Sequence, residues 1–171
     1  MAIFGFYKLH ANAVNPAYGT EHSACFDLHA HLTDENGNPR LIKQINSVGE
    51  AHEWKAFDGK IHIRPCTTAL IPTGLIAQME PGWSLRVHMR SSVAFKRGLI
   101  LPNGEGVVDA DYYHELFMMV RNVSHNGLDI THGERICQGE WVPVLRFPIT
   151  EIHTRPQQTT DRIGGFGSTG V

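Results

Sequence analysis

The amino-acid sequence predicts an all-β protein with a jelly-roll-like β-barrel or sandwich fold. Helical periodicity is nearly absent, and the apolar segments are short and rich in Val, Ile and Phe. Gly, Pro and Asn separate these segments, which is typical of turns between the strands of a sandwich. The chain of 171 residues is long enough for one domain with a core of its own. We therefore expect one β domain at residues 1–155, followed by a mobile arm at 156–171.

The expected strands follow one another along the whole domain. In chain order they are Ile3–Leu9, Ala24–Ala30, Arg40–Ile45, Lys60–Ile63, Thr67–Pro72, Leu75–Glu80, Trp83–Met89, Leu99–Leu101, Glu115–Arg121, Leu128–Ile130 and Arg135–Arg146. One short helix is predicted at Ser92–Lys96, because Ser91 or Ser92 can cap its start and Gly98 can end it.

The segment Gly104–Asn122 carries two carboxylates, Asp109 and Asp111, and two phenol rings, Tyr112 and Tyr113, between apolar runs. This pattern predicts a β-hairpin with acids and aromatic rings at its tip. An ionised aspartate that is shielded from bulk water could hold and partly deprotonate a water molecule, while a tyrosine ring could pack against a sugar or a base. The alternative is a turn in which these side chains are only solvated, since Asp is a common turn former.

Residues 33–60 are more polar and richer in turn formers than their flanks. We interpret them as an insertion between two core strands that could form a hairpin, with Trp54 and Phe57 packed back onto the domain. The alternative is a lid or a surface for a protein partner, because long loops often carry function.

The formal net charge of −2 provides no basic excess for a nucleic-acid duplex or an anionic membrane. A small phosphorylated metabolite, held by a few local positive groups, fits this charge better. The three cysteines, Cys25, Cys66 and Cys137, are odd in number and far apart, which argues against disulfides and thiolate zinc sites. With no signal-like N-terminus and no apolar run of about 18 residues, we expect a cytoplasmic protein, in a bacterium or a phage-infected host.

The sequence contains 11 histidines, and His22, His29 and His31 lie close together along the chain. No H-E-x-x-H motif occurs, and the other histidines are scattered singly. We therefore expect ordinary surface or strand histidines rather than a metal site.

The C-terminal segment from Pro156 contains too little apolar mass to fold by itself. Its glycines expose backbone N–H groups that can surround phosphate oxygens, Arg162 adds a charged fork, and Phe166 can cover a flat ring. This composition favours a closing flap, and a frayed terminus is the alternative.

Five short stretches together resemble, in order and spacing, the five motifs of the trimeric dUTP pyrophosphatase (dUTPase) family. They are A-C-F-D-L-H-A at 24–30, R-S-S at 90–92, G-V-V-D-A-D-Y at 106–112, G-E-R-I-C-Q at 133–138 and R-I-G-G-F-G-S-T-G at 162–170. The resemblance implies a jelly-roll-like subunit, a homotrimer with three sites between subunits, and Mg²⁺-dependent hydrolysis of dUTP to dUMP and pyrophosphate.

For the segment around residue 109, the resemblance implies a catalytic role for Asp109, which would hold the attacking water for in-line displacement at the α-phosphorus. Tyr112 would pack against the deoxyribose and leave no room for a 2'-hydroxyl. Asn103 and the backbone of Gly106 and Val108 would form the uracil pocket.

For the phosphates, the resemblance implies contacts from Arg90, Ser91, Ser92 and Gln138. Asp27 would either position water bound to the metal or order the site, and Mg²⁺ would otherwise be held by the substrate phosphates. For Arg135, a phosphate contact and an ion pair between strands are both open. In the arm, Arg162 would reach the γ-phosphate and Phe166 would stack on uracil. The residues expected to shape and line the wrap are Gly164, Gly165, Gly167, Ser168 and Thr169.

The chain departs from the family pattern after Tyr112, because Tyr113 and His114 replace the usual basic or polar residue and glycine. A deaminase of the related dCTP deaminase family is not expected, since its catalytic glutamate would correspond to Met119. Hydrolysis of dCTP or another deoxypyrimidine triphosphate remains an alternative. So does a nucleotide-binding regulator that grips a protein partner through residues 33–60.

Overall fold

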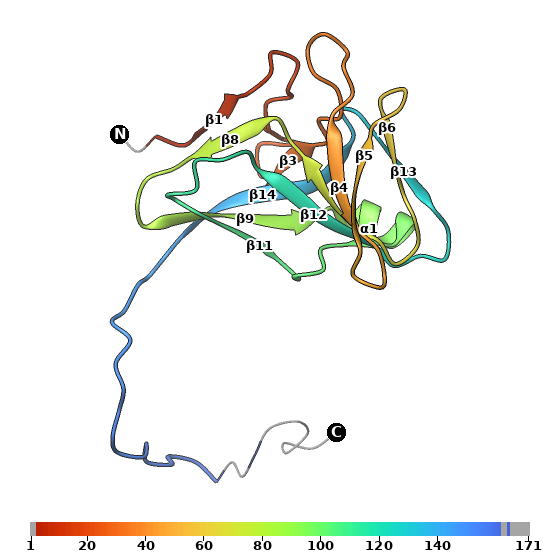
Figure 1. Ribbon diagram of the computed structural model, residues 1–171. Helices are drawn as coiled ribbons and strands as arrows, with labels where there is room; N and C mark the ends of the chain where they lie inside the picture. The colour runs from red at the N-terminus through yellow and green to blue at the C-terminus, as the bar shows by residue number, and fades with distance from the viewer. Residues whose placement is uncertain (1–2, 162–163, 165–171) are drawn as a thin grey trace.

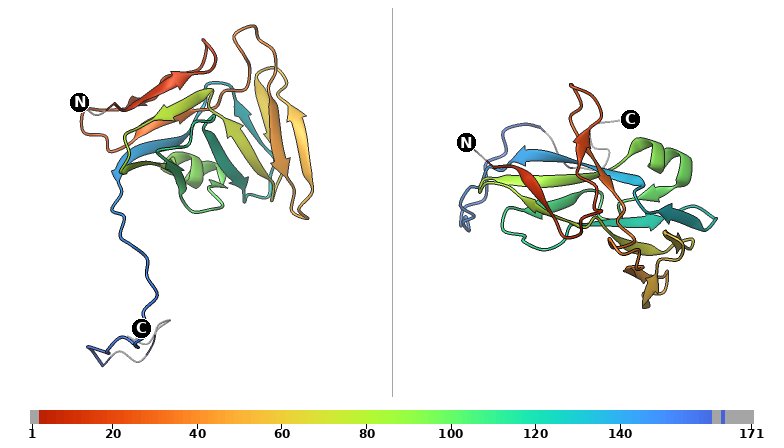
Figure 2. Two further views of the ribbon diagram at one scale, coloured as in Figure 1. Left: turned by 60° about the vertical axis from the view of Figure 1, so that its left-hand side comes forward. Right: turned by 90° about the horizontal axis from the view of Figure 1, so that it is seen from above.

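The computed structural model describes residues 3–161 and residue 164, and it shows a β-sandwich (Figure 1). The expected all-β class is confirmed, and the two main sheets have five strands each. The two sheets stack on each other (Figure 2), and apolar side chains from both form one buried core. Within the described part of the chain, no helix is long and apolar enough to cross a membrane.

One main sheet has the strand order β11-β9-β14-β3-β2. Its strands are β2 (Ala17–Tyr18), β3 (Phe26–His29), β9 (Trp83–Met89), β11 (Gly106–Asp109) and β14 (Arg135–Pro143). The pairing is antiparallel throughout, and β14 lies between β9 and β3. This register decides which polar residues meet at each end of the sheet.

The other main sheet has the order β10-β12-β7-β4-β5. Its strands are β4 (Leu41–Ile45), β5 (Ala51–Lys55), β7 (Thr68–Pro72), β10 (Leu99–Ile100) and β12 (Phe117–Asn122). Two further pairs complete the fold, namely β1 (Gly5–Lys8) with β8 (Leu75–Gln78) and β6 (Lys60–Ile63) with β13 (Leu128–Thr131).

The core lies between the two main sheets. Leu28, Leu85 and Cys137 come from one sheet, and Ile42 and Met118 come from the other, and all five are fully buried. Because apolar and polar residues alternate along most strands, each main sheet buries one face. The alternation in the sequence therefore predicted most strands correctly. The short strand β2 lacks that signal and was not predicted, and the fully exposed β5 was expected only as part of a hairpin within residues 33–60, without bounds of its own.

The predicted hairpin at 104–122 is wrong. Strand β11 pairs with β9, whereas β12 pairs with β7 and β10 in the opposite sheet. The chain thus crosses from one sheet to the other after Asp109. Two apolar runs joined by a short polar segment do not distinguish a hairpin from a crossing between sheets, because both bury one face of each strand.

The insertion at 33–60 contains the hairpin of β4 and β5, as expected. The expectation that Trp54 and Phe57 pack back onto the domain is wrong, since they are 48% and 85% exposed. Strand β5 is an edge strand, so its far side has no neighbouring strand in the described structure to cover these rings.

The helix α1 (Ser91–Arg97) follows β9 directly and ends at Gly98, which has a φ of 67°. The expected serine cap is wrong, because Arg90 occupies the N-cap position and makes no side-chain cap. Strand β14 ends at Pro143, not at Arg146, and the described residues after it carry no helix or strand and run away from the sheets (Figure 1). A domain boundary at residue 155 stays a prediction.

Candidate active site

A cluster of charged side chains lies where β9 meets α1. The Asp27 carboxylate pairs with Arg90 Nε at 2.9 Å and with Arg135 Nη1 at 3.0 Å. The register places Gln138 directly opposite Asp27 on one side and opposite His88 on the other. One carboxylate thus holds two guanidinium groups, and the local surplus of positive charge suits an anion.

Strand pairing explains why these residues meet. The N–H of Arg90 donates to the carbonyl of Ile136 at 3.3 Å, so the end of β9 is tied to the start of β14. Ser91 and Ser92 follow Arg90 and are exposed. All the predicted phosphate residues outside the arm therefore lie at one end of one sheet. Arg135 of β14 makes an ion pair with Asp27 of β3, which confirms one of the two roles considered for this arginine.

His29 was not predicted as part of this cluster. Its Nδ1 is buried without a hydrogen-bond partner among the described residues, and it lies two positions after Asp27 on the same face of β3. Burial lowers the pKa of His29, Asp27 opposes this shift, and Arg135 and Arg90 add to it. A histidine between apolar residues gives no sequence signal that separates it from an ordinary strand residue.

A groove separates β11 from β12. It consists of two adjoining hollows of about 290 and 170 Å³ that share Val107, Val108, Phe117 and Met119. The hollows are also lined by predicted site residues, namely Asn103, Gly106, Asp109 and Tyr112. Because β11 is the edge of its sheet, one side of its backbone has no strand partner in the described structure and can offer donors and acceptors to a ligand.

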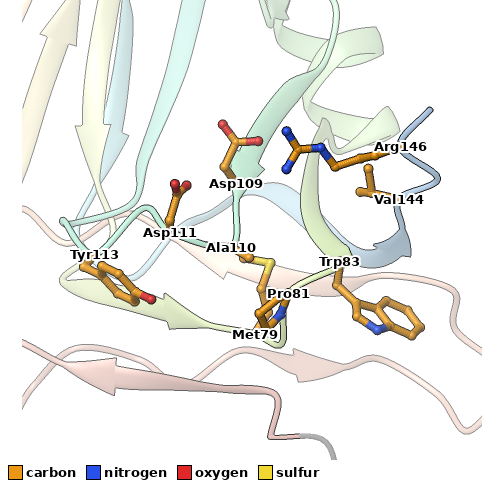
Figure 3. Close-up of a pocket in the computed structure, with 10 residues that line it drawn as sticks. Met79, Pro81, Trp83, Asp109, Ala110, Asp111, Tyr113, Val144 and Arg146 are labelled. Atoms are coloured by element: carbon orange, nitrogen blue, oxygen red, sulfur yellow. The ribbon is translucent and has the colours of Figure 1, made fainter. Parts of the chain in front are cut away.

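Asp109 ends β11 and lies between this groove and a larger hollow of about 500 Å³. Figure 3 shows its carboxylate above Asp111, with the Arg146 guanidinium turned toward it. Asp109 is exposed in the single chain, so its predicted shielding is not provided by its own subunit. Trp83 and Arg146 also line the hollow and were not predicted, because neither belongs to a motif.

Tyr112 is 38% exposed, and its hydroxyl donates to the carbonyl of Glu115 at 3.0 Å. Its ring meets His114 edge to face, with the ring centroids 5.7 Å apart. Tyr113 is more exposed and faces the larger hollow (Figure 3). The two residues that depart from the family pattern therefore flank Tyr112 rather than fill the groove.

The two groups of predicted residues lie at opposite ends of β9. Asp109 is opposite Ser84, whereas Arg90 directly follows the strand. The stretch from Ser84 to Arg90 spans about 20 Å at about 3.3 Å per residue. One chain therefore brings together Asp27, Arg90 and Gln138, and separately Asp109 and Tyr112, but it does not bring the two groups together.

The described part of the chain contains no group of three or more His, Cys, Asp and Glu residues that could hold a metal ion. At the charged cluster, both Asp27 oxygens are engaged by arginines. A Mg²⁺ ion would therefore need ligands from a substrate, which agrees with its preference for phosphates and water. The predicted arm residues Arg162, Gly165, Phe166, Gly167, Ser168 and Thr169 lie outside the described residues.

Two stacked five-stranded sheets, with an arginine-rich cluster beside α1 and a groove along β11 and β12, define a β-sandwich protein that could bind an anionic ligand. The family model named dUTPase matches residues 58–170. The chain belongs to the dUTPase family. The matched range contains four of the five motifs, and the stretch at 24–30 precedes it.

Relatives and solved structures agree with this family. A deoxyuridine 5'-triphosphate nucleotidohydrolase from Caulobacter vibrioides is 31% identical over 157 residues, which are 91% of this chain and 85% of the relative. One from Nautilia profundicola is 32% identical and covers 95% of both chains. The crystal structure of dUTPase from Streptococcus mutans is 26% identical, with a TM-score of 0.66, and covers 84% of this chain and 98% of its own.

The fold also matches the dUTPase of Staphylococcus bacteriophage 80alpha in a structure with dUPNHPP. The TM-score is 0.74 and the match covers 99% of both chains, at 20% identity. At this identity the match supports the shared fold alone.

Proposed function

We propose that this protein hydrolyses dUTP to dUMP and pyrophosphate. The observation that carries the proposal is the groove between β11 and β12, which gathers Asn103, Gly106, Val108, Asp109 and Tyr112 in a family whose relatives are named for this reaction. The groove has the size and lining of a site for one flat ring and a sugar.

Recognition of the base uses the free edge of β11. The backbone at Gly106 and Val108 and the amide of Asn103 offer donors and acceptors to the edge of uracil. The Tyr112 ring packs against the deoxyribose at the mouth of the groove. A 2'-hydroxyl would meet this ring without a hydrogen-bond partner, so a ribonucleotide is bound more weakly.

Recognition of the phosphates uses the charged cluster. Arg90, Ser91, Ser92 and Gln138 bind the triphosphate, and Asp27 keeps the guanidinium of Arg90 in place. When bound, Mg²⁺ neutralises part of the phosphate charge, and Asp27 is the residue of this chain that could contact its water shell.

The chemical step is attack by water on the α-phosphorus. Asp109 accepts a proton from the water as the new oxygen–phosphorus bond forms, and the bond from the α-phosphorus to the bridging oxygen of pyrophosphate breaks in line with it. The negative charge passes to the departing pyrophosphate, where the arginines of the cluster stabilise it.

A complete site requires a second copy of the chain, because its two halves lie about 20 Å apart in one chain. The segment after β14 supports assembly, since Leu145, Phe147, Ile149 and Ile152 are between 67% and 101% exposed. Exposure of several large apolar side chains to water is unfavourable, and burial against another subunit would remove this cost. We propose a homotrimer in which the arm at 156–171 closes over a neighbour's site, with Arg162 on the γ-phosphate and Phe166 on uracil.

Two alternatives share this machinery. A hydrolase of dCTP or another deoxypyrimidine triphosphate would differ only at the edge of the base. A regulatory role through residues 33–60 is favoured by one observation, the exposed rings of Trp54 and Phe57 on that insertion. We still expect a cytoplasmic location and no nucleic-acid partner.

The test is a pyrophosphate-release assay on dUTP, dCTP, dTTP and UTP, with and without Mg²⁺. We expect dUTP to be preferred and the rate to depend on Mg²⁺. The variant Asp109→Asn should lose activity by roughly 100-fold or more while it still binds a non-hydrolysable dUTP analogue, because only the proton acceptor is removed. A preference for dCTP would select the first alternative, and an Asp109→Asn variant with normal turnover would refute the assigned base.

A further inference from the structure

The turn that carries Asp109 and Tyr112 is anchored at its far end by residues 115 and 116. The N–H of Leu116 donates to the carbonyl of Leu75 at 2.8 Å, and the Leu116 carbonyl accepts the Thr73 hydroxyl at 2.7 Å. Within the turn, the N–H of Tyr112 donates to the Asp109 carbonyl at 3.1 Å. The hydroxyl of Tyr112 then binds the carbonyl of Glu115. The position of the phenol ring thus depends on where Glu115 lies.

The carboxylate of Glu115 is held mainly by Arg40, a residue far away in sequence. Both guanidinium NH₂ groups donate to it, one to each oxygen, at 2.7 Å. The N–H of Gly74 donates to the same carboxylate at 2.7 Å. The side chains of Arg40 and Glu115 are only 19% and 11% exposed. A forked pair in such a place has a defined geometry, and removing one partner leaves a charge without compensation.

Arg40 is in turn fixed by a buried histidine. Its Nη1 donates to His31 Nδ1 at 3.1 Å. The tautomer of His31 follows from its other neighbour, because Asn12 Nδ2 donates to the carbonyls of Thr33 and Asp34 and so turns Oδ1 toward the ring. His31 Nε2 therefore carries the proton and donates to Asn12 Oδ1 at 2.9 Å, which leaves Nδ1 as an acceptor for Arg40.

This network joins the insertion to the candidate active site. Arg40 directly precedes β4, and its backbone is tied to Leu32 and Ala56 at both ends of the inserted hairpin, with N–O distances of 2.9 and 3.1 Å. The sequence predicts an ordinary surface or strand residue at His31. In the structure, His31 is only 1% exposed and is hydrogen-bonded to Arg40. The insertion therefore contributes the Arg40 side chain, which binds Glu115 at the end of the turn that carries Asp109 and Tyr112.

We infer that Arg40 is a positioning residue for sugar selection, acting through Glu115 on the ring of Tyr112. The inference rests on the proposed function. Without the guanidinium fork, the Glu115 carboxylate would turn toward water and carry its carbonyl, the partner of the Tyr112 hydroxyl, with it. The ring would then no longer press on the sugar, so a 2'-hydroxyl would be tolerated. Lysine cannot replace the fork, because one ammonium group cannot match both oxygens and also reach His31.

The experiment compares Arg40→Met and Arg40→Lys in the full-length chain with the control Arg97→Met. The control removes a similar arginine–glutamate pair, between Arg97 and Glu134, that does not touch the turn. The ratio of kcat/KM for UTP to that for dUTP should rise about tenfold or more in Arg40→Met, less in Arg40→Lys, and not at all in the control. An unchanged ratio in a folded Arg40→Met variant would overturn the inference.

Hydrogen exchange separates this inference from the proposed function, because it does not require activity. The amides of residues 109–116 should exchange faster in Arg40→Met than in the wild type, and Arg97→Met should leave them unchanged. Unchanged exchange at the turn refutes the positioning role even if dUTP is the substrate. If the wild type does not hydrolyse dUTP but the turn amides respond, the proposed function fails and the structural role of Arg40 stands.

A second variant guards against a folding defect. Arg40→Met with Glu115→Gln removes both charges, so no uncompensated carboxylate remains. We expect this double variant to be more stable than Arg40→Met and to keep the relaxed sugar selectivity, because a neutral amide cannot restore the fork. Wild-type selectivity in the folded double variant would contradict the inference.

Discussion

The two ends of strand β9 carry two groups of predicted site residues, and these groups are positioned differently. At the α1 end, Asp27, Arg90 and Arg135 are placed by strand register and by ion pairs within one sheet. At the Ser84 end, Asp109 and Tyr112 lie on a crossing between the sheets, and the far end of this crossing carries Glu115, the ion-pair partner of Arg40. The proposed phosphate half is thus positioned by strand pairing, whereas the proposed sugar half lies beside a side-chain contact from the insertion.

The largest expected effect concerns the separation of the halves. We expect Asp109→Asn and Arg90→Ala to be nearly inactive alone and to recover activity when their subunits are mixed. If each site takes one half from each of two subunits, random mixing leaves about a quarter of the sites with both halves intact. The measurement is the rate of pyrophosphate release after the two variants are refolded together.

A matched control pairs two variants of the same half, Arg90→Ala and Gln138→Ala. Their mixture should be no more active than the average of the two, because every site contains one defect. Failure of the first mixture to recover, with mixed assemblies demonstrated by mass, would show that the halves do not meet across subunits.

The second prediction weakens the sugar half from its supporting side. Gly74 has a φ of 71°, and a Cβ there would lie 2.9 Å from both Ala13 Cβ and His31 Cγ. Gly74→Ala should therefore lower the free energy of unfolding by roughly 3 kcal/mol, through backbone strain and overpacking together. Denaturant titration measures the change.

The control for this prediction is Gly37→Ala. Gly37 has a φ of 79°, but nothing lies within 4 Å of its added Cβ, so only the backbone cost applies, about 1 kcal/mol. If the two substitutions cost the same, the tight contact of Gly74 with His31 contributes nothing.

The smallest expected effect is a pH dependence of the same network. Burial, with Arg40, His10 and His132 adding to it and Glu115 opposing it, lowers the pKa of His31 from 6.5 to about 4. Between pH 6.5 and 4, His31 therefore binds a proton in the unfolded chain but not in the folded chain. The free energy of unfolding falls as the pH drops through this range. At about 1.4 kcal/mol per pKa unit, the loss is at most about 3.5 kcal/mol.

The comparison of wild type with His31→Gln isolates this contribution. Glutamine is polar but does not titrate, so the unfolding free energy of the His31→Gln variant should fall less between pH 7 and pH 4.5 than that of the wild type. Denaturant titration at fixed protein concentration measures this difference. Equal slopes in the two proteins would mean that His31 does not titrate as its surroundings require.

Local patterns carried much of the prediction. Alternating apolar residues located most strands, because burial of one sheet face requires an apolar residue at every second position. Gly98 marked the end of the helix, because glycine readily adopts the left-handed φ found there. The motif residues Asn103, Gly106, Val108, Asp109 and Tyr112 do share one groove. The bounds of strand β5 could not be predicted because all five of its residues are exposed, and only its pairing with β4 makes it a strand.

The sequence by itself determined the class of fold, the identity of the charged and aromatic residues, and the family of the chain. Those features depend on residue type and short spacing. Only the tertiary structure decided that β11 and β12 belong to different sheets, that the predicted site residues form two groups along β9, and that Arg40 meets Glu115. The Arg40–Glu115 contact joins residues 75 positions apart, and its formation depends on the free energy of the whole packed domain rather than on any local pattern.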